Sequence, residues 1–151
     1  MVSSQPSQPR YAHTIFCDDV RYETSGKAII IGVYSSDMFV SGDVPITLPR
    51  LLILCEVVSP IEDPVKRLKI RAFGPPLGQE EPEAEIPDIP LPIAPDGREF
   101  VASVVRVAID LAPFTVHAEG FIEVTVETER ETMRAGRLYI HFLPSPEVSQ
   151  I

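Results

Sequence analysis

Residues 16–34, FCDDVRYETSGKAIIIGVY, decide the fold class of this chain. Two extended, apolar-rich runs flank a Thr-Ser-Gly turn at residues 24–26, where glycine supplies the positive φ that such a turn requires. The pattern predicts a β-hairpin. Both faces of its second arm, residues 27–34, are apolar, which favours a strand in the centre of a sheet. The acidic pair Asp18 and Asp19 at its head either fixes local backbone or belongs to a site.

The rest of the chain continues with strand patterns. Residues 51–58 (LLILCEVV) form a near-continuous apolar run, and residues 67–73 alternate so that Leu68, Ile70 and Ala72 point inward. No segment keeps a helical period over the length of a helix. We therefore expect an all-β fold, a mostly antiparallel β-sandwich of about eight strands. The expected strands are residues 11–17, 20–23, 27–34, 38–40, 51–58, 67–73, 100–111, 120–128 and 136–143.

The last two of these strands are expected to form a hairpin. Centring its loop at Thr132 places Glu127 opposite Arg137 and Glu123 opposite His141. Groups that can carry opposite charges then face each other twice, which is how a hairpin register is stabilised.

The corner at residues 111–114 (LAPF), which leads into Gly120 and Phe121, resembles the entry to the penultimate strand of immunoglobulin-like domains. We therefore expect a sandwich that is immunoglobulin-like in outline. Phe121 lies near the place of the tyrosine found at such corners but lacks its hydroxyl, and the chain has no tryptophan.

The domain organisation follows from length and composition. A chain of 151 residues suits one domain and allows a core without disulfides or metals. Residues 1–10 (MVSSQPSQPR) have no apolar centre, so they do not form a secretory signal. We expect a flexible N-terminal tail at residues 1–10, one β-sandwich domain at 11–144 with a proline-rich, acidic insertion loop at 74–98, and a flexible C-terminal tail at 145–151.

The net charge of −9 limits the partners that this chain can bind directly. An acidic surface repels the phosphates of nucleic acids and the anionic surfaces of membranes, so we expect neither as a partner. No apolar run is long enough for a transmembrane helix. The expected location is the cytoplasm.

The two cysteines, Cys17 and Cys55, are expected to be free, buried thiols, because nothing in the sequence directs the chain to an oxidising compartment. A disulfide across two strands is the alternative. Cys17 stands beside Asp18, whose charge disfavours a thiolate, and this favours a structural cysteine over a nucleophile.

No catalytic or metal-binding pattern stands out in the sequence. The loop acids lack the D-x-D-x-D-G spacing of a calcium loop, and the histidines and cysteines lack the spacing of a zinc site. There is no G-x-S-x-G elbow and no glycine-rich phosphate loop. We expect no catalytic residue, no metal ligand and no cofactor. The alternative is a ligand or metal site, or a small enzyme, with Asp18, Asp19 and Arg21 lining the site.

Residues 74–98 are the candidate partner contact. They hold seven prolines and six acidic residues, and proline-rich extended segments bind partners at low entropic cost. A plain surface loop is the alternative, its second half an edge segment or a polyproline-II strand. The outward basic row Arg67, Lys69 and Arg71 either meets an acidic partner or is balanced by Glu56 on a neighbouring strand. The residues expected to contact a partner are Glu81, Glu83, Pro87, Ile89, Leu91 and Ile93.

A set of short elements is spread over about half of the chain: Cys17-Asp18-Asp19, Arg21, Glu23, Gly26-Lys27, Gly32, Tyr34, Leu48-Pro49 and the run from Gly120 to Val124. This set resembles a family of small, uncharacterised bacterial and phage-encoded proteins. The resemblance implies a β-rich fold with no assigned activity, so it carries over no catalytic residue.

The function expected from these observations is structural or protein-binding, without enzymatic activity. The resemblance implies one concrete form, an accessory or decoration-type protein of a phage or prophage virion, which would place the chain in a virion rather than in the cytoplasm. The expected partner is another protein or further copies of the chain itself.

Overall fold

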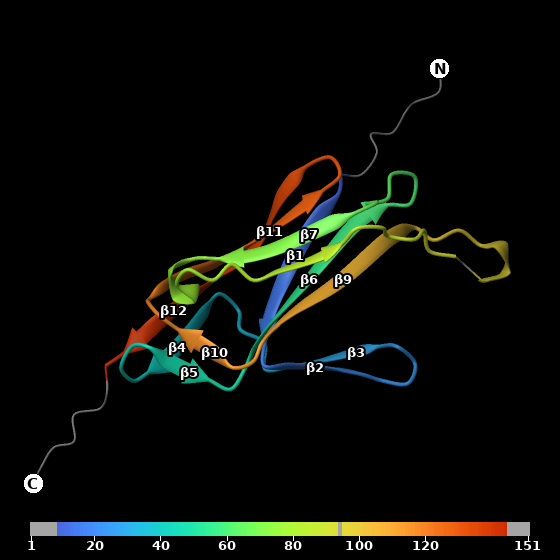
Figure 1. The fold of residues 1–151 in the computed structure, drawn as a ribbon. Helices are drawn as coiled ribbons and strands as arrows, with labels where there is room; N and C mark the ends of the chain where they lie inside the picture. Colours follow the sequence, from blue (N-terminus) through green and yellow to red (C-terminus); the bar gives the residue numbers. More distant parts are fainter. Residues whose placement is uncertain (1–8, 94, 145–151) are drawn as a thin grey trace, which may run out of the picture.

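The computed structural model describes residues 9–93 and 95–144, which fold almost wholly into β-strands (Figure 1). One sheet has the strand order β1-β6-β9, a second has the order β4-β12-β11-β7-β8, and two ribbons have two strands each, β2-β3 and β5-β10. All pairs are antiparallel except β4 with β12. The strands are β1 Tyr11–Cys17, β2 Asp19–Tyr22, β3 Ala28–Ile31, β4 Asp37–Ser41, β5 Ile46–Leu48, β6 Leu51–Pro60, β7 Leu68–Phe73, β8 Glu83–Ile86, β9 Ala102–Leu111, β10 Phe114–Val116, β11 Gly120–Thr128 and β12 Thr132–Leu143.

This architecture confirms the expected all-β, mostly antiparallel, sandwich-like fold. In the immunoglobulin arrangement one sheet holds strands A, B, E and D, and the other holds C, F and G, with C′ added beside C in variable-type domains. Here β1, β6 and β9 take the places of A, B and E in the same order, and β8, β7, β11 and β12 take those of C′, C, F and G. The helical segments of the described residues are two short 3-10 turns, η1 Pro75–Leu77 and η2 Pro95–Gly97, and no described helix has the length and apolarity needed to cross a membrane.

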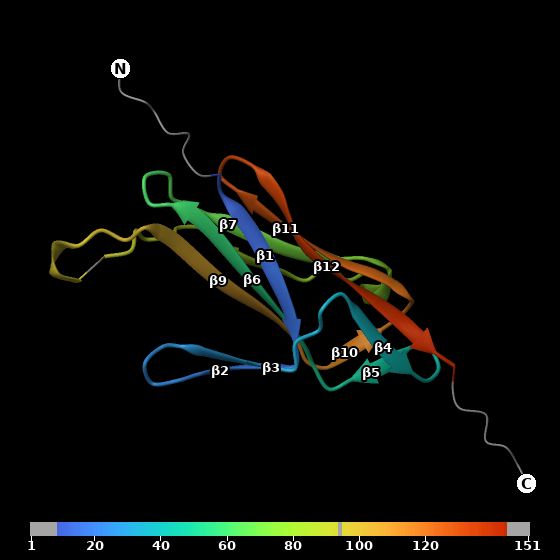
Figure 2. The same ribbon diagram turned by 180° about the vertical axis from the view of Figure 1, so that it is seen from behind.

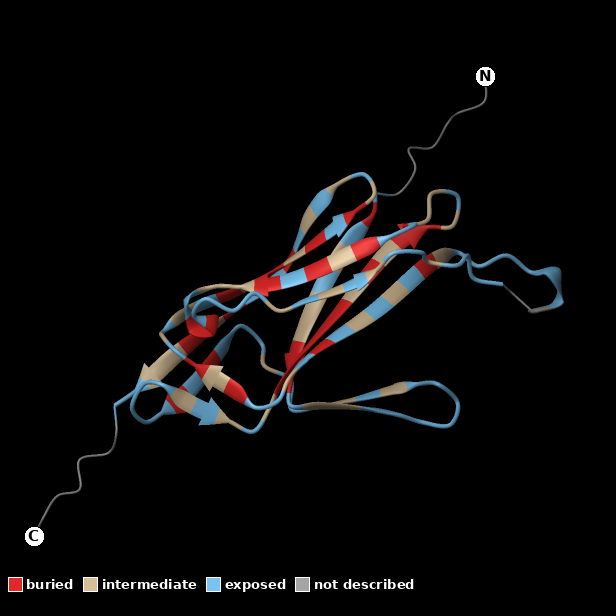
Figure 3. Cartoon of the chain, viewed as in Figure 1, coloured by how far each residue is buried: buried red, intermediate tan, exposed pale blue. Residues whose placement is uncertain are grey.

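The core lies between the two sheets, where alternate residues of each strand point inward (Figure 3). Leu68, Ile70 and Ala72 of β7 are buried, as their alternation predicts. In β6 almost every residue is buried, including Leu52 and Leu54 on the face that points away from the main core. That second face is covered by a small cluster of its own, which explains why the run at residues 51–58 is apolar without interruption.

The prediction of a central strand at residues 27–34 was wrong. The hairpin and its turn are present, but β3 ends at Ile31 and pairs only with β2, in a ribbon that extends from the body of the molecule (Figure 2). Gly32 ends the strand with a φ of +69°, and a Cβ at this position would lie 2.0 Å from an oxygen of Asp18. One face of the arm packs on the body, where Ile30 contacts the cluster that covers the second face of β6 (the outer cluster). The other face is apolar but open to water, and Ile29 on it is 45% exposed.

The hairpin of β11 and β12 is present, but the predicted register was wrong. Arg137 lies opposite Glu123 rather than Glu127, and Glu127 lies opposite Thr132. The turn comes earlier than expected because Thr128 and Glu131 close it, with the Thr128 N–H donating to the Glu131 carbonyl at 2.8 Å. A register shift after Val124 then displaces the pairing again along the strands.

The segment at residues 74–98 is more ordered than a loose acidic loop. It contains η1 and the strand β8, which pairs with β7 along four residues and forms one edge of the larger sheet. The Ala72 N–H also donates to the Pro82 carbonyl at 3.0 Å, which holds the chain in place before β8. The second half, from Pro87 onward, runs as an irregular loop beyond the sheet (Figure 1).

Arg10, placed in the N-terminal tail by its sequence context, belongs to the packed body. Its side chain is only 2% exposed and lies among the carboxylates of Asp63, Glu129 and Glu131, with Glu129 Oε1 at 2.6 Å. It also donates to the Pro64 carbonyl at 2.9 Å. This arginine joins the loop after β6 to the turn between β11 and β12. Of the tails expected at residues 1–10 and 145–151, residues 1–8 and 145–151 lie outside the described residues.

Both cysteines are free and buried, as expected. They belong to different clusters: Cys55 packs in the main core, and Cys17 packs with Leu52 and Leu54 on the opposite face of the sheet. Burial raises the pKa of both thiols, and the neighbouring Asp18 carboxylate raises that of Cys17 further.

Candidate functional site

The solvent-facing side of the larger sheet carries a row of aromatic side chains and arginines, which we call the aromatic face. The alternation of the strands places them there. In β12, Leu138 and Ile140 are buried, so the residues that alternate with them, Arg137, Tyr139 and His141, point outward. The members of the aromatic face are Phe39 from β4, Arg137, Tyr139 and His141 from β12, Phe121 from β11, and Phe73 from β7.

The rings of the aromatic face contact one another across three strands. Tyr139 meets Phe121 edge to face at 4.8 Å between centroids and lies 4.4 Å from the His141 ring. His141 stacks on Phe39 at 4.7 Å. The guanidinium of Arg137 lies 4.4 Å from the centre of the Phe121 ring, which is cation–π geometry. These contacts join three neighbouring strands into one continuous surface because β4 pairs with β12 in parallel.

Asp37 fixes the orientation of the His141 ring. Its Oδ1 lies 2.6 Å from His141 Nε2, and its other oxygen accepts a hydrogen bond from the Ser36 hydroxyl. These two hydrogen bonds, from Ser36 and then from His141, hold the pKa of Asp37 below its usual range. The prediction that His141 pairs with Glu123 was wrong, because the parallel strand β4 brings Asp37 closer.

Serine, histidine and aspartate therefore meet at this place, but not in the order of a hydrolase triad. In a triad the histidine lies between the other two and takes the proton of the serine. Here Asp37 lies between Ser36 and His141, and both make their hydrogen bonds to its carboxylate. The arrangement orients an imidazole ring and does not activate a hydroxyl.

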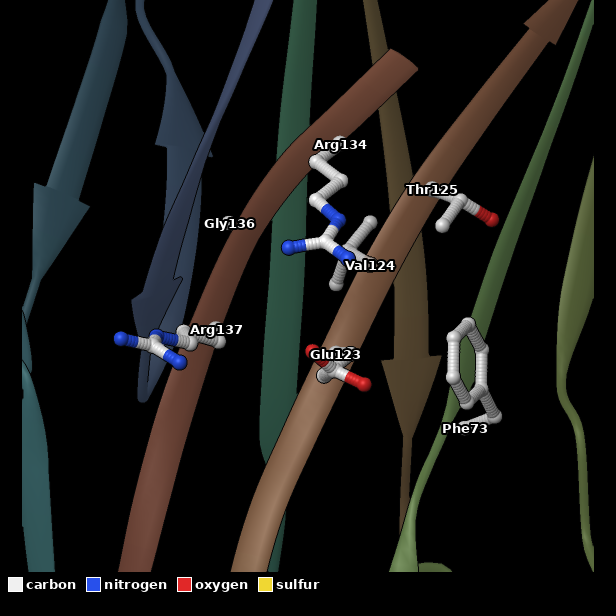
Figure 4. Close-up of a pocket in the computed structure, with 7 residues that line it drawn as sticks. All are labelled: Phe73, Glu123, Val124, Thr125, Arg134, Gly136 and Arg137. Carbon is white, nitrogen blue, oxygen red and sulfur yellow. The ribbon is translucent and has the colours of Figure 1, made fainter. Parts of the chain in front are cut away.

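Next to the aromatic face the sheet is hollowed by a depression of about 490 Å³ (Figure 4). It lies at the register shift between β11 and β12, where the regular ladder of the two strands is interrupted. Gly136 lines it with backbone alone, and a Cβ there would point to the other sheet and lie 3.1 Å from Thr14 of β1. The residues that line the depression are Phe73, Glu123, Val124, Thr125, Arg134, Gly136 and Arg137.

Arg134 and Arg137 give this depression an excess of positive charge. Among the described residues, neither arginine makes an ion pair, and Glu123 is the only acidic residue of the lining. Because the whole chain carries a net charge of −9, a locally positive surface is an exception on this molecule. Aromatic rings and unpaired arginines side by side provide apolar contact together with attraction for a carboxylate.

The residues expected to contact a partner lie on two successive parts of the chain, before or within β8 and after it. Glu81 and Glu83 lie beside β7 and form ion pairs with Arg71 at 3.8 Å and Lys69 at 3.2 Å. Lys69 and Arg71 of the basic row are thus balanced by these two glutamates, while Glu56 pairs with Arg106 at 3.3 Å instead.

The other members of that predicted set lie along the irregular segment after β8. Ile89 packs against the core, and its N–H donates to the Lys66 carbonyl at 2.9 Å. Pro87 is exposed, and Leu91 and Ile93 are 63% and 92% exposed, on the part of the chain that runs beyond the sheet.

At the alternative site, the carboxylates of Asp18 and Asp19 already bind side chains of the chain itself. Asp18 Oδ1 accepts a hydrogen bond from the Tyr34 hydroxyl at 2.9 Å, and burial with this hydrogen bond raises the pKa of Tyr34 to about 12. Asp19 pairs with Arg21 at 3.2 Å and with Arg50 at 2.6 Å, and the hydrogen bond from Arg21 contributes most to lowering its pKa. Among the described residues, no group of three or more His, Cys, Asp or Glu side chains could hold a metal ion.

The aromatic face could not be read from sequence alone, although part of its signal is visible there. The alternation in residues 136–143 already assigns Arg137, Tyr139 and His141 to the outward side. What the sequence lacks is the parallel pairing of β4 that brings Phe39 beside them, and the hairpin register that places Phe121 opposite Tyr139.

Comparison with known proteins places the chain in a family. It matches the model of DUF6941, described as a family of unknown function, over residues 13–141. No curated protein matches the chain. The matched region includes the hairpin at the head of the chain, most of both sheets and the whole aromatic face. The chain belongs to the DUF6941 family.

Proposed function

We propose that this chain is a non-enzymatic protein-binding module and that its contact surface is the aromatic face. The observation that carries the proposal is the set of contacts that joins Phe39, His141, Tyr139, Phe121 and Arg137 on a solvent-facing sheet. Aromatic residues and arginine are enriched in protein interfaces and supply most of their binding energy. Phe39 is 61% exposed and Phe121 36%, so both have apolar area left to bury.

The chemistry of the surface indicates the kind of partner. Arg134 and Arg137 are unpaired among the described residues and flank the depression beside the rings. A protein segment that presents an apolar side chain next to a carboxylate would satisfy both features, with the carboxylate held by the arginines. The expected interaction therefore weakens as the salt concentration rises.

Among the described residues of this area, no side chain is hydrogen-bonded in a way that would activate a nucleophile, and this supports a binding role over an enzymatic one. The Ser36 hydroxyl donates to Asp37 and not to His141. The depression is lined by no cysteine, histidine or serine. The carboxylates of Asp18 and Asp19, the alternative location of a site, are already engaged by Tyr34 and by arginines.

A role as an accessory protein of a phage or prophage virion is a more specific form of this proposal. It rests on the resemblance to small bacterial and phage-encoded proteins. In that case the partner is a shell protein present in many copies, and the chain is recovered with virions rather than alone.

Affinity capture from a lysate of the native host tests the proposal. The wild-type chain is compared with Arg137→Glu/Tyr139→Ala, which changes the aromatic face, and with Lys27→Glu/Tyr22→Ala, which makes matched changes on the β2-β3 ribbon. The proposal expects a protein, identified by mass, that the wild type and the ribbon variant both retain and that the aromatic-face variant loses. Retention by all three folded proteins, or by none, would count against it.

A further inference from the structure

The strand β9 has one edge without a partner among the described residues. It pairs with β6 from Leu51–Leu111 to Pro60–Ala102 along its full length, and no backbone hydrogen bond joins its other edge to any described residue. In the immunoglobulin arrangement a further strand, D, lies at this place. Here the preceding segment carries prolines at positions 87, 90, 92 and 95, which cannot donate to a ladder, and it runs away from the sheet (Figure 1).

The other sheet edges of the described chain are short or covered, as exposed edges usually are. β8 has four residues between Pro82 and Pro87, and β4 has five. β1 lies against β12, and its Phe16 carbonyl accepts a hydrogen bond from the Tyr34 N–H at 2.8 Å. β9, by contrast, has ten residues, no proline and no register shift. A long, regular edge of this kind is a template for another strand.

The side chains along β9 favour the addition of an apolar strand. Val105, Val107 and Leu111 face the core but are only partly buried. Val104 on the outward side is 54% exposed. A strand placed beside β9 would cover the first three and continue the core.

We propose that this added strand is β9 of a second copy, paired antiparallel about a two-fold axis at Ala108. In this register Arg106 lies opposite the partner's Asp110, and the same pair recurs on the other side of the axis. Val107 lies opposite the partner's Ile109 on the core side of the sheet, whereas the two Arg106–Asp110 pairs lie on its outward side. The two sheets then join into one sheet of six strands.

The charges single out this register. With the axis at Arg106, two arginines would face each other, and with the axis at Asp110 two aspartates would do so. Axes at Val107 or Ile109 leave both charges opposite neutral residues. The side chain of Arg106 is 35% exposed and that of Asp110 is 47% exposed. Each can therefore meet a charge of the partner in addition to the ion pair that it already makes, Arg106 with Glu56 of β6 and Asp110 with Arg50. Pro113, which has no N–H, ends the ladder just past Ala112.

This inference is independent of the proposed function, since the aromatic face belongs to the other sheet and stays open in the dimer. Analytical ultracentrifugation of the full chain over a range of concentrations measures the dimer directly. Arg106→Asp places like charges opposite each other at two symmetric positions and should raise the dimer dissociation constant by about tenfold or more. Arg106→Asp/Asp110→Arg restores opposite charges and should restore the dimer. Lys27→Asp, a matched reversal on the β2-β3 ribbon, should dimerise like the wild type.

A crosslink tests the axis itself. Ala108→Cys brings two thiols opposite each other at the axis, within the Cα separation that a disulfide spans, so mild oxidation should give a covalent dimer. Val104→Cys, on the same face but away from the axis, should stay uncrosslinked. Circular dichroism and the melting temperature confirm that each variant is folded. A wild-type chain that is monomeric at every concentration, or a dimer that neither responds to the charge reversal nor crosslinks at Ala108→Cys, would overturn the proposal.

Discussion

Replacing Arg10 by alanine should destabilise the fold strongly, although the residue lies next to the N-terminal tail. Its guanidinium makes five hydrogen bonds, two to Asp63 and one each to Pro64, Glu129 and Glu131. The Arg10 side chain is 2% exposed, whereas the three carboxylates are 23% to 34% exposed. The loss of the arginine therefore leaves a gap in the packed body and three carboxylates near one another.

The magnitude follows from this difference in exposure. Removing one partner of a fully buried ion pair costs about 3–5 kcal/mol. Because water can reach the three carboxylates once the guanidinium is gone, we expect the lower end, about 3 kcal/mol. For a domain of this length that corresponds to a fall in melting temperature of about 6–12 °C.

Urea unfolding followed by circular dichroism measures this change in the free energy of unfolding. Arg130→Ala is the matched control. Arg130 binds the same Asp63 carboxylate with two hydrogen bonds, at 2.7 and 3.1 Å, but its side chain is 56% exposed. An exposed pair contributes at most about 1 kcal/mol. If Arg10→Ala cost no more than Arg130→Ala, the buried arginine would not hold the two loops together, and the reasoning would fail.

Three further predictions concern stability and accessibility. The Arg130 and Arg10 guanidiniums hold the pKa of Asp63 below its usual range, so its ionised form stabilises the fold above the unfolded-state pKa of about 3.9. That stabilisation is lost as the pH falls through the lower folded-state pKa. Asp63→Asn should flatten the acid limb of the stability profile below about pH 4, and an unchanged limb would contradict this assignment. Gly32→Ala should cost clearly more stability in urea than Gly26→Ala, because both residues have positive φ but only at Gly32 would a Cβ collide with Asp18. Equal costs would show that the collision is relieved. The two cysteines are buried and burial raises their pKa, so DTNB should label them only on unfolding, and prompt labelling of the native protein would contradict their placement.

Much of the sandwich follows from local alternation of apolar and polar residues. β7 shows a two-residue period because one face of the strand is buried and the other is solvated, and that pattern identifies Leu68, Ile70 and Ala72. β6 is apolar throughout because both of its faces are covered. The sequence of β3 is as apolar as that of a central strand, yet only one face of β3 packs on the outer cluster of β6, and its other face is open to water. A pattern of side chains reports that a face is apolar, but not what covers it.

The candidate site could not be predicted from such patterns, for a different reason. Phe39 is far from Phe121 and Tyr139 in the chain and reaches them because β4 joins β12 in parallel, while Phe121 meets Tyr139 through a hairpin register that differs from the expected one. The hairpin register likewise depends on the turn that Thr128 and Glu131 close. Arg10 meets its carboxylates through loops that no periodicity describes.

The most direct test of the aromatic face as a binding surface is the free energy with which purified variants bind the captured partner, measured by isothermal titration calorimetry. The account predicts that Tyr139→Ala, at the centre of the ring contacts, loses about 2 kcal/mol, or about thirtyfold in Kd. Tyr22→Ala removes an equally large ring, 62% exposed on the β2-β3 ribbon, and should bind as the wild type does. Unchanged binding by a folded Tyr139→Ala protein, or a greater loss in Tyr22→Ala, would contradict the account.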